Sequence, residues 1–240
     1  DTDISSAAAL CAKLQPAADV KLRESPRWVD KGSLPAHCEV RGIKANKVEF
    51  LMRLPTPWNG RFMMAGCGGF CGELLPDKPG YSNSINEAVK RGYAAIAHDG
   101  GHKAASWDTD WAADAEALDI WAYRILPLMV DVGLDLTRQT YGKDPDYKYF
   151  SGCSNGGRLG LIAAQRYPHL FDGIAAGASI FDLSGTAGLW GNWLISNAYR
   201  ENALLLDSSI QSRLKKIVLQ QCDVKDGRTD GMISEPRSCD

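Results

Sequence analysis

The sequence has no long hydrophobic run and no concentration of basic residues. No stretch approaches the roughly 18–20 uninterrupted apolar residues that cross a bilayer. The 240 residues carry 27 Lys and Arg against 29 Asp and Glu, a formal net charge of -2. The basic residues also form none of the clusters that a nucleic acid or an anionic membrane would require. We therefore expect neither a nucleic-acid partner nor a membrane partner.

Two further absences bear on the cell compartment. The first residues, DTDISSAAALCAKL, lack the basic-then-apolar order of a signal peptide, so a leader has been removed or there was none. The cysteines show no CxxC spacing of a zinc site. Seven cysteines are more typical of a disulfide-bonded protein in an oxidising compartment, which favours a removed signal peptide and a secreted or periplasmic protein. An odd number leaves one cysteine without a partner within this chain.

The hydrophobic residues, 45% of the chain, alternate between strand and helix patterns. Residues 47–54, KVEFLMRL, have the two-residue period of a half-buried strand. Residues 84–92 follow as a helix with a serine cap, and residues 114–140 form a long amphipathic helix that Pro127 must kink or break. The other predicted strands are RFMMAG (61–66), YAAIAHD (93–99), YKYFSG (147–152) and FDGIAAGAS (171–179), and a further helix covers 155–167. This alternation predicts a mainly parallel α/β sheet.

The sequence GCSNG at residues 152–156 fits the pattern G-x-S-x-G between a predicted strand and a predicted helix. In that context the serine lies on a tight strand-to-helix turn, where small neighbours expose its hydroxyl. The helix N-terminus behind it offers N–H groups to a developing oxyanion. Ser154 is therefore a candidate nucleophile. The alternative is a glycine-rich turn with no chemistry.

The histidines do not supply an obvious base for Ser154. The nucleophile of this fold is followed in the chain by the acid and then the histidine, and only His169 lies downstream. A helix from the elbow would place His169 on the order of 20 Å away. His98 and His102 lie upstream, in HDGGH, and are more easily interpreted as structural or pocket-wall residues. We expect the acid and the base to lie in a remainder of the same polypeptide beyond Asp240.

Several motifs in order resemble the tannase and feruloyl esterase family, which includes mono(2-hydroxyethyl) terephthalate hydrolase-like enzymes. They are LPAHCEV (34–40), PWNGRFMMAGCGGF (57–70), AAIAHDGGH (94–102), YFSGCSNGGRLG (149–160), YPHLFDGIAAGA (167–178) and CDVKDGRTDG (222–231). The resemblance implies an α/β-hydrolase fold with an inserted lid domain, of which this chain holds the N-terminal part. Residues 1–185 would belong to the catalytic domain. Residues 186–240, where the sequence becomes tryptophan-rich and then helical, would begin the lid.

The resemblance also implies roles for residues around the elbow. Cys153 would form a disulfide with a cysteine beyond this chain, directly after the catalytic histidine; the alternative is a buried free thiol. The backbone N–H groups of Gly69 and Asn155 would form the oxyanion hole. Cys67 and Cys71 flank Gly69 in GCGGFCG, and the sequence leaves open whether they pair or remain as two thiols.

The last loop, DVKDGRTDG, holds three aspartates in a short segment. Carboxylates this close repel one another unless they are solvated or share a hard cation such as Ca²⁺. By resemblance, a structural calcium ion is bound by Asp223, Asp226 and Asp230 and by the backbone oxygens of Arg228 and Met232. The alternative is a polar surface loop. The resemblance further implies the disulfides Cys11–Cys38 and Cys222–Cys239.

These features together predict a serine esterase that cleaves small-molecule esters of aromatic acids through an acyl-enzyme. Gallate, feruloyl or related hydroxycinnamoyl, and terephthalate esters are all compatible with the sequence. Trp190 and Trp193 could border the pocket, although core packing is the commoner role of tryptophan. The alternative hypotheses are a non-catalytic secreted calcium-binding or adhesion module, and a serine peptidase or thioesterase of the same fold.

Overall fold

The computed structural model describes residues 4–78, 81, 83–201 and 203–239. The chain divides into two compact units, residues 1–181 and residues 182–240. The division falls close to the expected boundary after residue 185. That the second unit begins a lid remains a prediction.

The first unit contains a sheet and its covering helices. Its elements in chain order are α1 (Ile4–Cys11), β1 (Val20–Leu22), β2 (Arg27–Val29), β3 (His37–Lys44), β4 (Val48–Pro55), β5 (Arg61–Ala65), α2 (Asn86–Lys90), β6 (Ala94–His98), the 3-10 helix η1 (Asp110–Ala113), α3 (Ala115–Asp119), the π-helix η2 (Ile120–Arg124), α4 (Ile125–Tyr141), β7 (Tyr147–Cys153), α5 (Asn155–Arg166) and β8 (Gly173–Gly177). Within the described residues, the strand order of the sheet is β1-β3-β4-β6-β5-β7-β8, with β2 paired to β3.

The sheet is mixed, which corrects the expectation of a mainly parallel one. Strands β6, β5, β7 and β8 are parallel neighbours, but β1 to β4 and the β4–β6 pair are antiparallel. A short turn joins β3 to β4, and in it Ala45 and Asn46 have φ values of 52° and 57°. Two positive-φ residues are typical of a tight hairpin, which forces its strands to run antiparallel. The parallel half is the part that carries the elbow.

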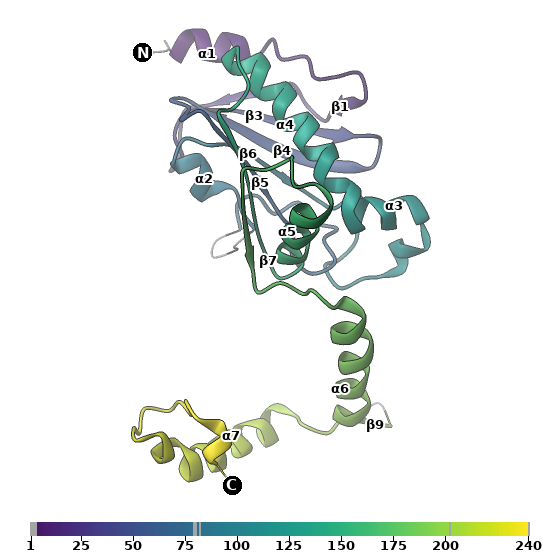
Figure 1. The fold of residues 1–240 in the computed structure, drawn as a ribbon, viewed down its shortest axis with the longest axis vertical. Helices are drawn as coiled ribbons and strands as arrows, with labels where there is room; N and C mark the ends of the chain where they lie inside the picture. Colours follow the sequence, from purple (N-terminus) through teal and green to yellow (C-terminus); the bar gives the residue numbers. More distant parts are fainter. Residues whose placement is uncertain (1–3, 79–80, 82, 202, 240) are drawn as a thin grey trace. The chain divides into compact units, whose positions relative to one another are not determined.

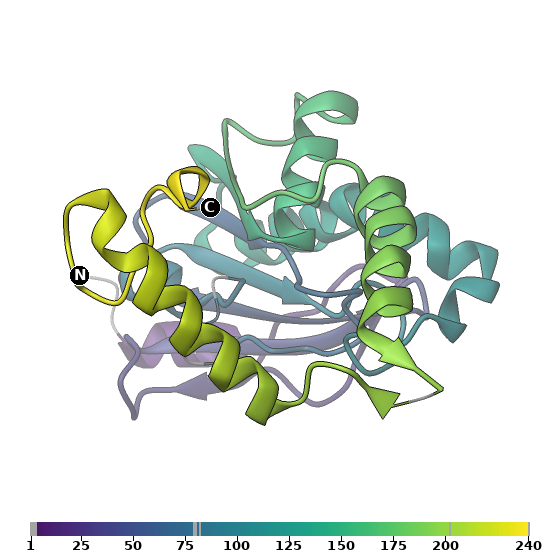
Figure 2. The ribbon, with the colours of Figure 1, turned by 90° about the horizontal axis from the view of Figure 1, so that it is seen from below.

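Helices cover both faces of the sheet (Figures 1 and 2). Helix α4 runs along one face, where Gly133 meets the ring of Phe62 on β5. The next residue of β5, Met63, points to the other face, where it packs with Val89 of α2. Strand β4 is consequently buried along its whole length, so the prediction of a half-buried strand at 47–54 was wrong.

The helix predicted at 114–140 consists of α3, η2 and α4 in direct succession. Pro127 lies in the first turn of α4, immediately after the π-helical turn. Proline has no N–H to donate to an earlier carbonyl, which explains why the regular α-helix is interrupted close to Pro127, as expected. The serine cap expected at 84–92 is not formed, since α2 begins after Ile85 with no side-chain cap.

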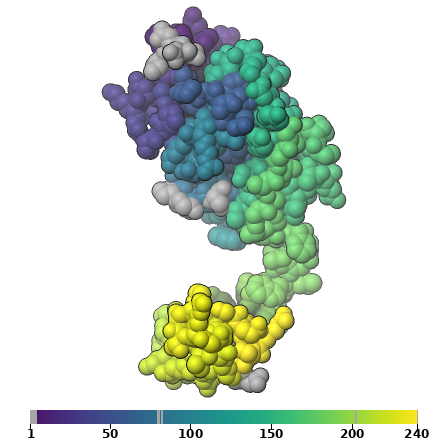
Figure 3. Space-filling view, turned by 60° about the vertical axis from the view of Figure 1, so that its left-hand side comes forward, coloured from purple at the N-terminus to yellow at the C-terminus, as the bar shows by residue number. Residues whose placement is uncertain are grey.

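The second unit is mainly helical. Its elements are the π-helix η3 (Ser184–Trp190), α6 (Gly191–Ala198), β9 (Tyr199–Arg200), β10 (Ala203–Leu204), α7 (Ser208–Cys222), and the 3-10 helices η4 (Asp223–Asp226) and η5 (Pro236–Ser238). Asp207 caps α7 by accepting a 2.9 Å hydrogen bond from the Ile210 N–H. Helix α7 and the loop after it form a compact body, coloured yellow-green to yellow in Figure 3, closed by the Cys222–Cys239 disulfide. No helix within the described ranges is long and apolar enough to cross a membrane.

Candidate active site

Ser154 occupies a strained turn between β7 and α5. Its φ and ψ are 60° and -117°, a conformation that costs a non-glycine residue on the order of 1–3 kcal/mol. The turn is held on both sides: the Ser154 N–H donates to the Gly177 carbonyl at 3.0 Å, and its carbonyl accepts from the Arg158 N–H at 3.0 Å. The surrounding structure thus fixes the elbow conformation that the G-x-S-x-G pattern predicts.

Glycines let the backbone close tightly around this turn. A Cβ added at Gly152 would collide with the backbone of Gly156, on the far side of the serine. A Cβ at Gly66 would lie 2.6 Å from the Gly156 Cα, so the end of β5 also touches the elbow. The sequence needs glycine at these positions because neighbouring backbone, not a movable side chain, fills the space.

The loop after β5 lies beside the elbow and is closed into a ring by the disulfide Cys67–Cys71. The sequence left open whether Cys67 and Cys71 pair or remain as two thiols, and in the structure they are paired. Gly69, inside the ring, has a φ of 57°, and a Cβ there would lie 2.5 Å from the Ser106 Oγ. The Phe70 N–H anchors the ring by donating to the Ser106 carbonyl at 2.7 Å.

The two candidate oxyanion donors are both available. Among the described residues, neither the Gly69 N–H nor the Asn155 N–H donates a hydrogen bond. Asn155 itself is buried, and its side-chain Nδ2 donates to the Cys67 carbonyl at 3.2 Å and contacts the Cys71 Sγ at 3.2 Å. The side chain of Asn155 therefore holds the ring that contains Gly69, the other candidate donor.

The segment between this ring and α2 holds both parts of the site, a feature that sequence reasoning missed. The Tyr81 hydroxyl accepts a 2.6 Å hydrogen bond from the Gly68 N–H in the ring. Asn83 pairs with the backbone of Cys153: its Oδ1 accepts from the N–H at 2.8 Å, and its Nδ2 donates to the carbonyl at 3.3 Å. Tyr81 and Asn83 thus fix the ring and the residue before Ser154.

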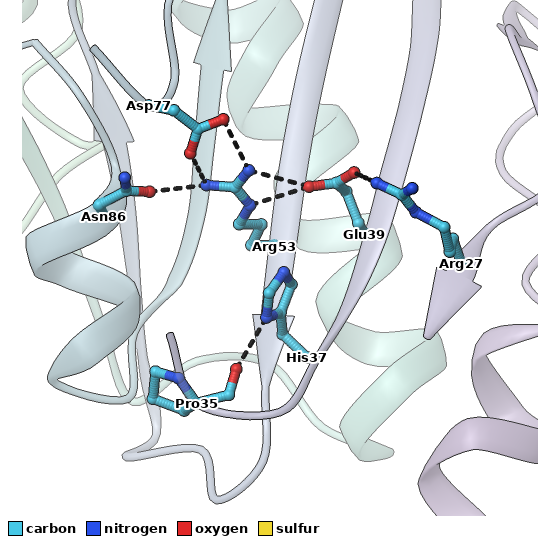
Figure 4. Close-up of polar contacts among 7 residues, drawn as sticks. All are labelled: Arg27, Pro35, His37, Glu39, Arg53, Asp77 and Asn86. Atoms are coloured by element: carbon cyan, nitrogen blue, oxygen red, sulfur yellow. Dashed lines mark hydrogen bonds and ion pairs between the residues drawn. The ribbon is translucent and has the colours of Figure 1, made fainter. Parts of the chain in front are cut away.

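An ionic network around the buried Arg53 and Glu39 anchors this segment to the sheet (Figure 4). The guanidinium of Arg53 on β4 donates to Asp77 and to Asn86, both at 2.6 Å, and to Glu39 on β3 at 2.9 Å. Burial acts to raise the pKa of Glu39, but hydrogen bonds from Arg27 and Arg53 outweigh it and hold that pKa below its usual value. Arg53 is one of three charged residues in KVEFLMRL, with Lys47 and Glu49, and no signal in the sequence singled it out.

The three histidines considered as a base lie apart from Ser154. His169 lies exposed after the C-terminal end of α5, with that twelve-residue helix between it and Ser154. His98 ends β6, and β5 separates β6 from β7; the His98 ring is buried, which lowers its pKa to about 4. His102 stacks on Trp111 at 3.7 Å, and burial lowers its pKa also to about 4. The structure brings none of these rings into a hydrogen bond with Ser154.

The remaining predicted residues are placed as follows. Disulfides join Cys11 to Cys38 and Cys222 to Cys239. Cys153 is partly buried and is free among the described cysteines, so its partner remains a prediction. Trp190 and Trp193 belong to the second unit and are 60% and 61% exposed, so they do not pack in a core of that unit.

The aspartates of the terminal loop accept hydrogen bonds from backbone N–H groups of the same loop. Asp223 accepts from Gly231 at 3.1 Å, and Asp230 from Met232 at 3.0 Å. Asp226 accepts from Ser234 at 2.7 Å and from Arg228 at 3.1 Å, which lowers its pKa. The oxygen donors suit Ca²⁺ chemically. Within the described residues, however, no three acidic, histidine or cysteine side chains gather as a metal site, and the calcium prediction stays a prediction.

The mixed sheet and the strand–serine–helix turn together define an α/β-hydrolase. Residues 33–240 match the family described as tannase and feruloyl esterase, and the chain belongs to that family.

Relatives with named activities support the assignment. The chain is 31% identical to mono(2-hydroxyethyl) terephthalate hydrolase of Piscinibacter sakaiensis, over 90% of this chain and 40% of that protein. It is 31% identical to feruloyl esterase B of Aspergillus niger, over 78% of this chain and 34% of that protein. The crystal structure of feruloyl esterase B from Aspergillus oryzae superposes with a TM-score of 0.79 at 26% identity, over 98% of this chain and 49% of the other. The chain thus spans less than half the length of these relatives.

Proposed function

We propose that the protein to which this chain belongs is a serine esterase that hydrolyses esters of aromatic acids. The observation that carries the proposal is the geometry around Ser154: a serine held at a φ of 60° on the elbow, with two backbone N–H groups, on the elbow and on the neighbouring ring, that have no partner among the described residues. The relatives' names, a feruloyl esterase and a terephthalate-ester hydrolase, indicate the substrate class. They give no support to a non-catalytic calcium-binding or adhesion module.

The proposed reaction begins with attack of the Ser154 hydroxyl on the ester carbonyl. A histidine elsewhere in the polypeptide takes the hydroxyl proton and passes it to the departing alcohol. The N–H groups of Gly69 and Asn155 stabilise the negative oxygen of the tetrahedral intermediate. Water then cleaves the acyl-serine and releases the aromatic acid. In this scheme Cys153 forms a disulfide with a cysteine next to that histidine, which limits the movement of the base relative to the elbow.

Assay of the complete protein on methyl gallate, methyl ferulate, chlorogenate and mono(2-hydroxyethyl) terephthalate tests the proposal. We expect hydrolysis of at least one of these aromatic esters at a kcat/KM well above that for an acetyl ester of the same alcohol. Hydrolysis of a peptide or a thioester in preference to all four would instead favour a peptidase or thioesterase of the same fold. No hydrolysis of any of them would contradict the proposal.

We also propose a secreted or periplasmic location and a structural calcium ion. The three disulfides of the described chain suit an oxidising compartment. Asp223, Asp226 and Asp230, with the backbone oxygens of Arg228 and Met232, would hold the ion. Its role would be to relieve carboxylate repulsion in the loop after α7, with no part in the ester chemistry.

A further inference from the structure

Arg158 carries a buried positive charge close to the nucleophile. It lies in the first turns of α5, and its exposed fraction is 8%. No carboxylate in the described part of the chain forms an ion pair with its guanidinium. Its partners are neutral oxygens: Nε donates to the Asn155 Oδ1 at 2.7 Å, Nη1 to the Ala122 carbonyl at 2.9 Å and Nη2 to the Trp121 carbonyl at 3.0 Å.

This placement is unfavourable for stability. Burial of a charge without a counter-ion is costly, and the N-terminal end of a helix disfavours a further positive charge. Burial lowers the pKa of Arg158 to about 10, which still leaves the guanidinium charged at neutral pH. The indole of Trp121, whose ring centre lies 4.0 Å from the guanidinium carbon, offsets part of the cost through a cation–π contact. Charges that break local rules in this way are expected at functional sites.

Arg158 also fixes which way the Asn155 carboxamide faces. Because the guanidinium can only donate, it requires the Asn155 oxygen on its side. The Asn155 nitrogen is then directed to the Cys67 carbonyl and the Cys71 sulfur. A continuous set of hydrogen bonds therefore runs from Arg158 through Asn155 to the ring that holds Gly69.

We propose that Arg158 is a positioning residue of the oxyanion hole. It holds the Asn155 side chain against the Cys67–Cys71 ring, so that the two N–H donors keep a fixed separation. Its charge also favours the negative oxygen of the tetrahedral intermediate, which would supply a counter-charge that the described residues do not provide. This inference rests on the proposed esterase function. It concerns transition-state stabilisation, so it predicts a loss in kcat more than a change in KM.

The test uses the complete protein, the aromatic ester that the wild type hydrolyses best, and the variant Arg158→Met. We expect kcat to fall by about 100-fold, the scale of losing one oxyanion donor, with KM within about threefold of wild type. A phenylboronic acid, which forms an anionic tetrahedral adduct with a serine, should lose affinity by a similar factor. Arg158→Lys, which keeps the charge but not the planar fork, should lose less.

Arg166→Met is the matched control. Arg166 lies on the same helix and over another aromatic ring, that of Tyr123 at 4.3 Å, but it is exposed and at the far end from Ser154. We expect its kcat within about twofold of wild type, as for other surface substitutions. If Arg158→Met does not fold, Asn155→Ala, which keeps the backbone N–H but loses the link to the ring, should lower kcat at least about tenfold.

The outcomes separate this inference from the proposed function. An active wild type together with a folded Arg158→Met protein of unchanged kcat and boronate affinity would overturn the inference alone. If only Asn155→Ala can be measured, a kcat equal to that of wild type would likewise overturn the inference. A wild type that hydrolyses none of the aromatic esters would overturn the proposed function, and this inference with it.

Discussion

Individual residues around Ser154 hold conformations and charges that a stable protein would otherwise avoid. Ser154 has a positive φ, and Arg158 is charged and buried with no counter-ion in the described part of the chain. The local pattern G-x-S-x-G and its flanks were sufficient to predict the first of these. The burial of Arg158 depends on Trp121 and on the Cys67–Cys71 ring. Both are distant from it in sequence, so no local pattern predicts these contacts. Sequence reasoning therefore located the candidate nucleophile but not the residues that position its surroundings.

The burial of a single residue, His98, can be tested by measuring how the stability of the protein depends on pH. Because burial lowers its pKa from 6.5 to about 4, the folded protein keeps the ring neutral while the unfolded chain binds a proton below about pH 6.5. The free energy of unfolding should therefore decrease as pH falls from about 6.5 to about 4, by up to about 3 kcal/mol from this residue. The buried Asp99, with a pKa raised to about 7, acts in the opposite direction over much of this range. The informative quantity is thus the difference between wild type and a variant.

His98→Gln provides that variant, since glutamine has no titration in this range. Urea unfolding at pH 7 and pH 4.5 should show a loss of stability that is about 1–3 kcal/mol larger in the wild type than in His98→Gln. Equal losses in the two proteins would mean that the His98 pKa is not lowered by folding.

At the scale of elements, the parallel strands β5 and β7 bring the ring and the elbow together, and the segment before α2 fixes them. The existence of these strands could be predicted from short apolar runs. The antiparallel half of the sheet and the full burial of β4 could not, because pairing direction and the covering of both faces are set by the tertiary structure. The Arg53 network is likewise tertiary: its partners Glu39, Asp77 and Asn86 come from β3, from a loop and from α2.

Asn83→Ala tests the role of this segment. Asn83 is buried and satisfies both the N–H and the carbonyl of Cys153. Removal of its side chain leaves these two groups unpaired, which should cost about 1–3 kcal/mol of stability, measured by urea unfolding. Asn86→Ala, at the start of α2 just after this segment, is the control, because Arg53 retains Asp77 and Glu39 as partners, and we expect it to cost less than about 1 kcal/mol. A similar, small effect of both substitutions would show that Asn83 does not hold the elbow.

At the scale of the whole molecule, the described chain supplies a candidate nucleophile and candidate oxyanion donors, and we propose that the base and acid belong to the rest of the polypeptide. The motifs quoted from the sequence were specific enough to predict the family, which the match over residues 33–240 shows. The choice among aromatic esters could not be predicted, because no motif in the sequence identified residues that recognise the aromatic ring. The second unit remains a predicted start of the lid.

Calcium dependence is the prediction that concerns this second unit. If the loop after α7 binds one ion in the folded state only, chelation should lower the melting temperature of the complete protein. The corresponding loss in the free energy of unfolding is about 2.7 kcal/mol when calcium had been present at 100 times its Kd. Asp226→Ala should melt at the chelated temperature and no longer respond to calcium. Asp207→Ala, which removes only the cap of α7, should lose stability but stay sensitive to the chelator. A metal analysis without calcium and a melting curve indifferent to chelator would show a solvated surface loop.

The central claim, that Ser154 is the nucleophile, is tested most directly by covalent labelling of the complete protein with a fluorophosphonate and peptide mass spectrometry. We predict one label per molecule on the peptide containing Ser154, with loss of ester hydrolysis in proportion to labelling. Ser154→Ala should take up no label and lose at least about a thousandfold in kcat, while its melting temperature stays nearly unchanged. A label on another serine, or a Ser154→Ala protein within about tenfold of wild-type turnover, would contradict the claim.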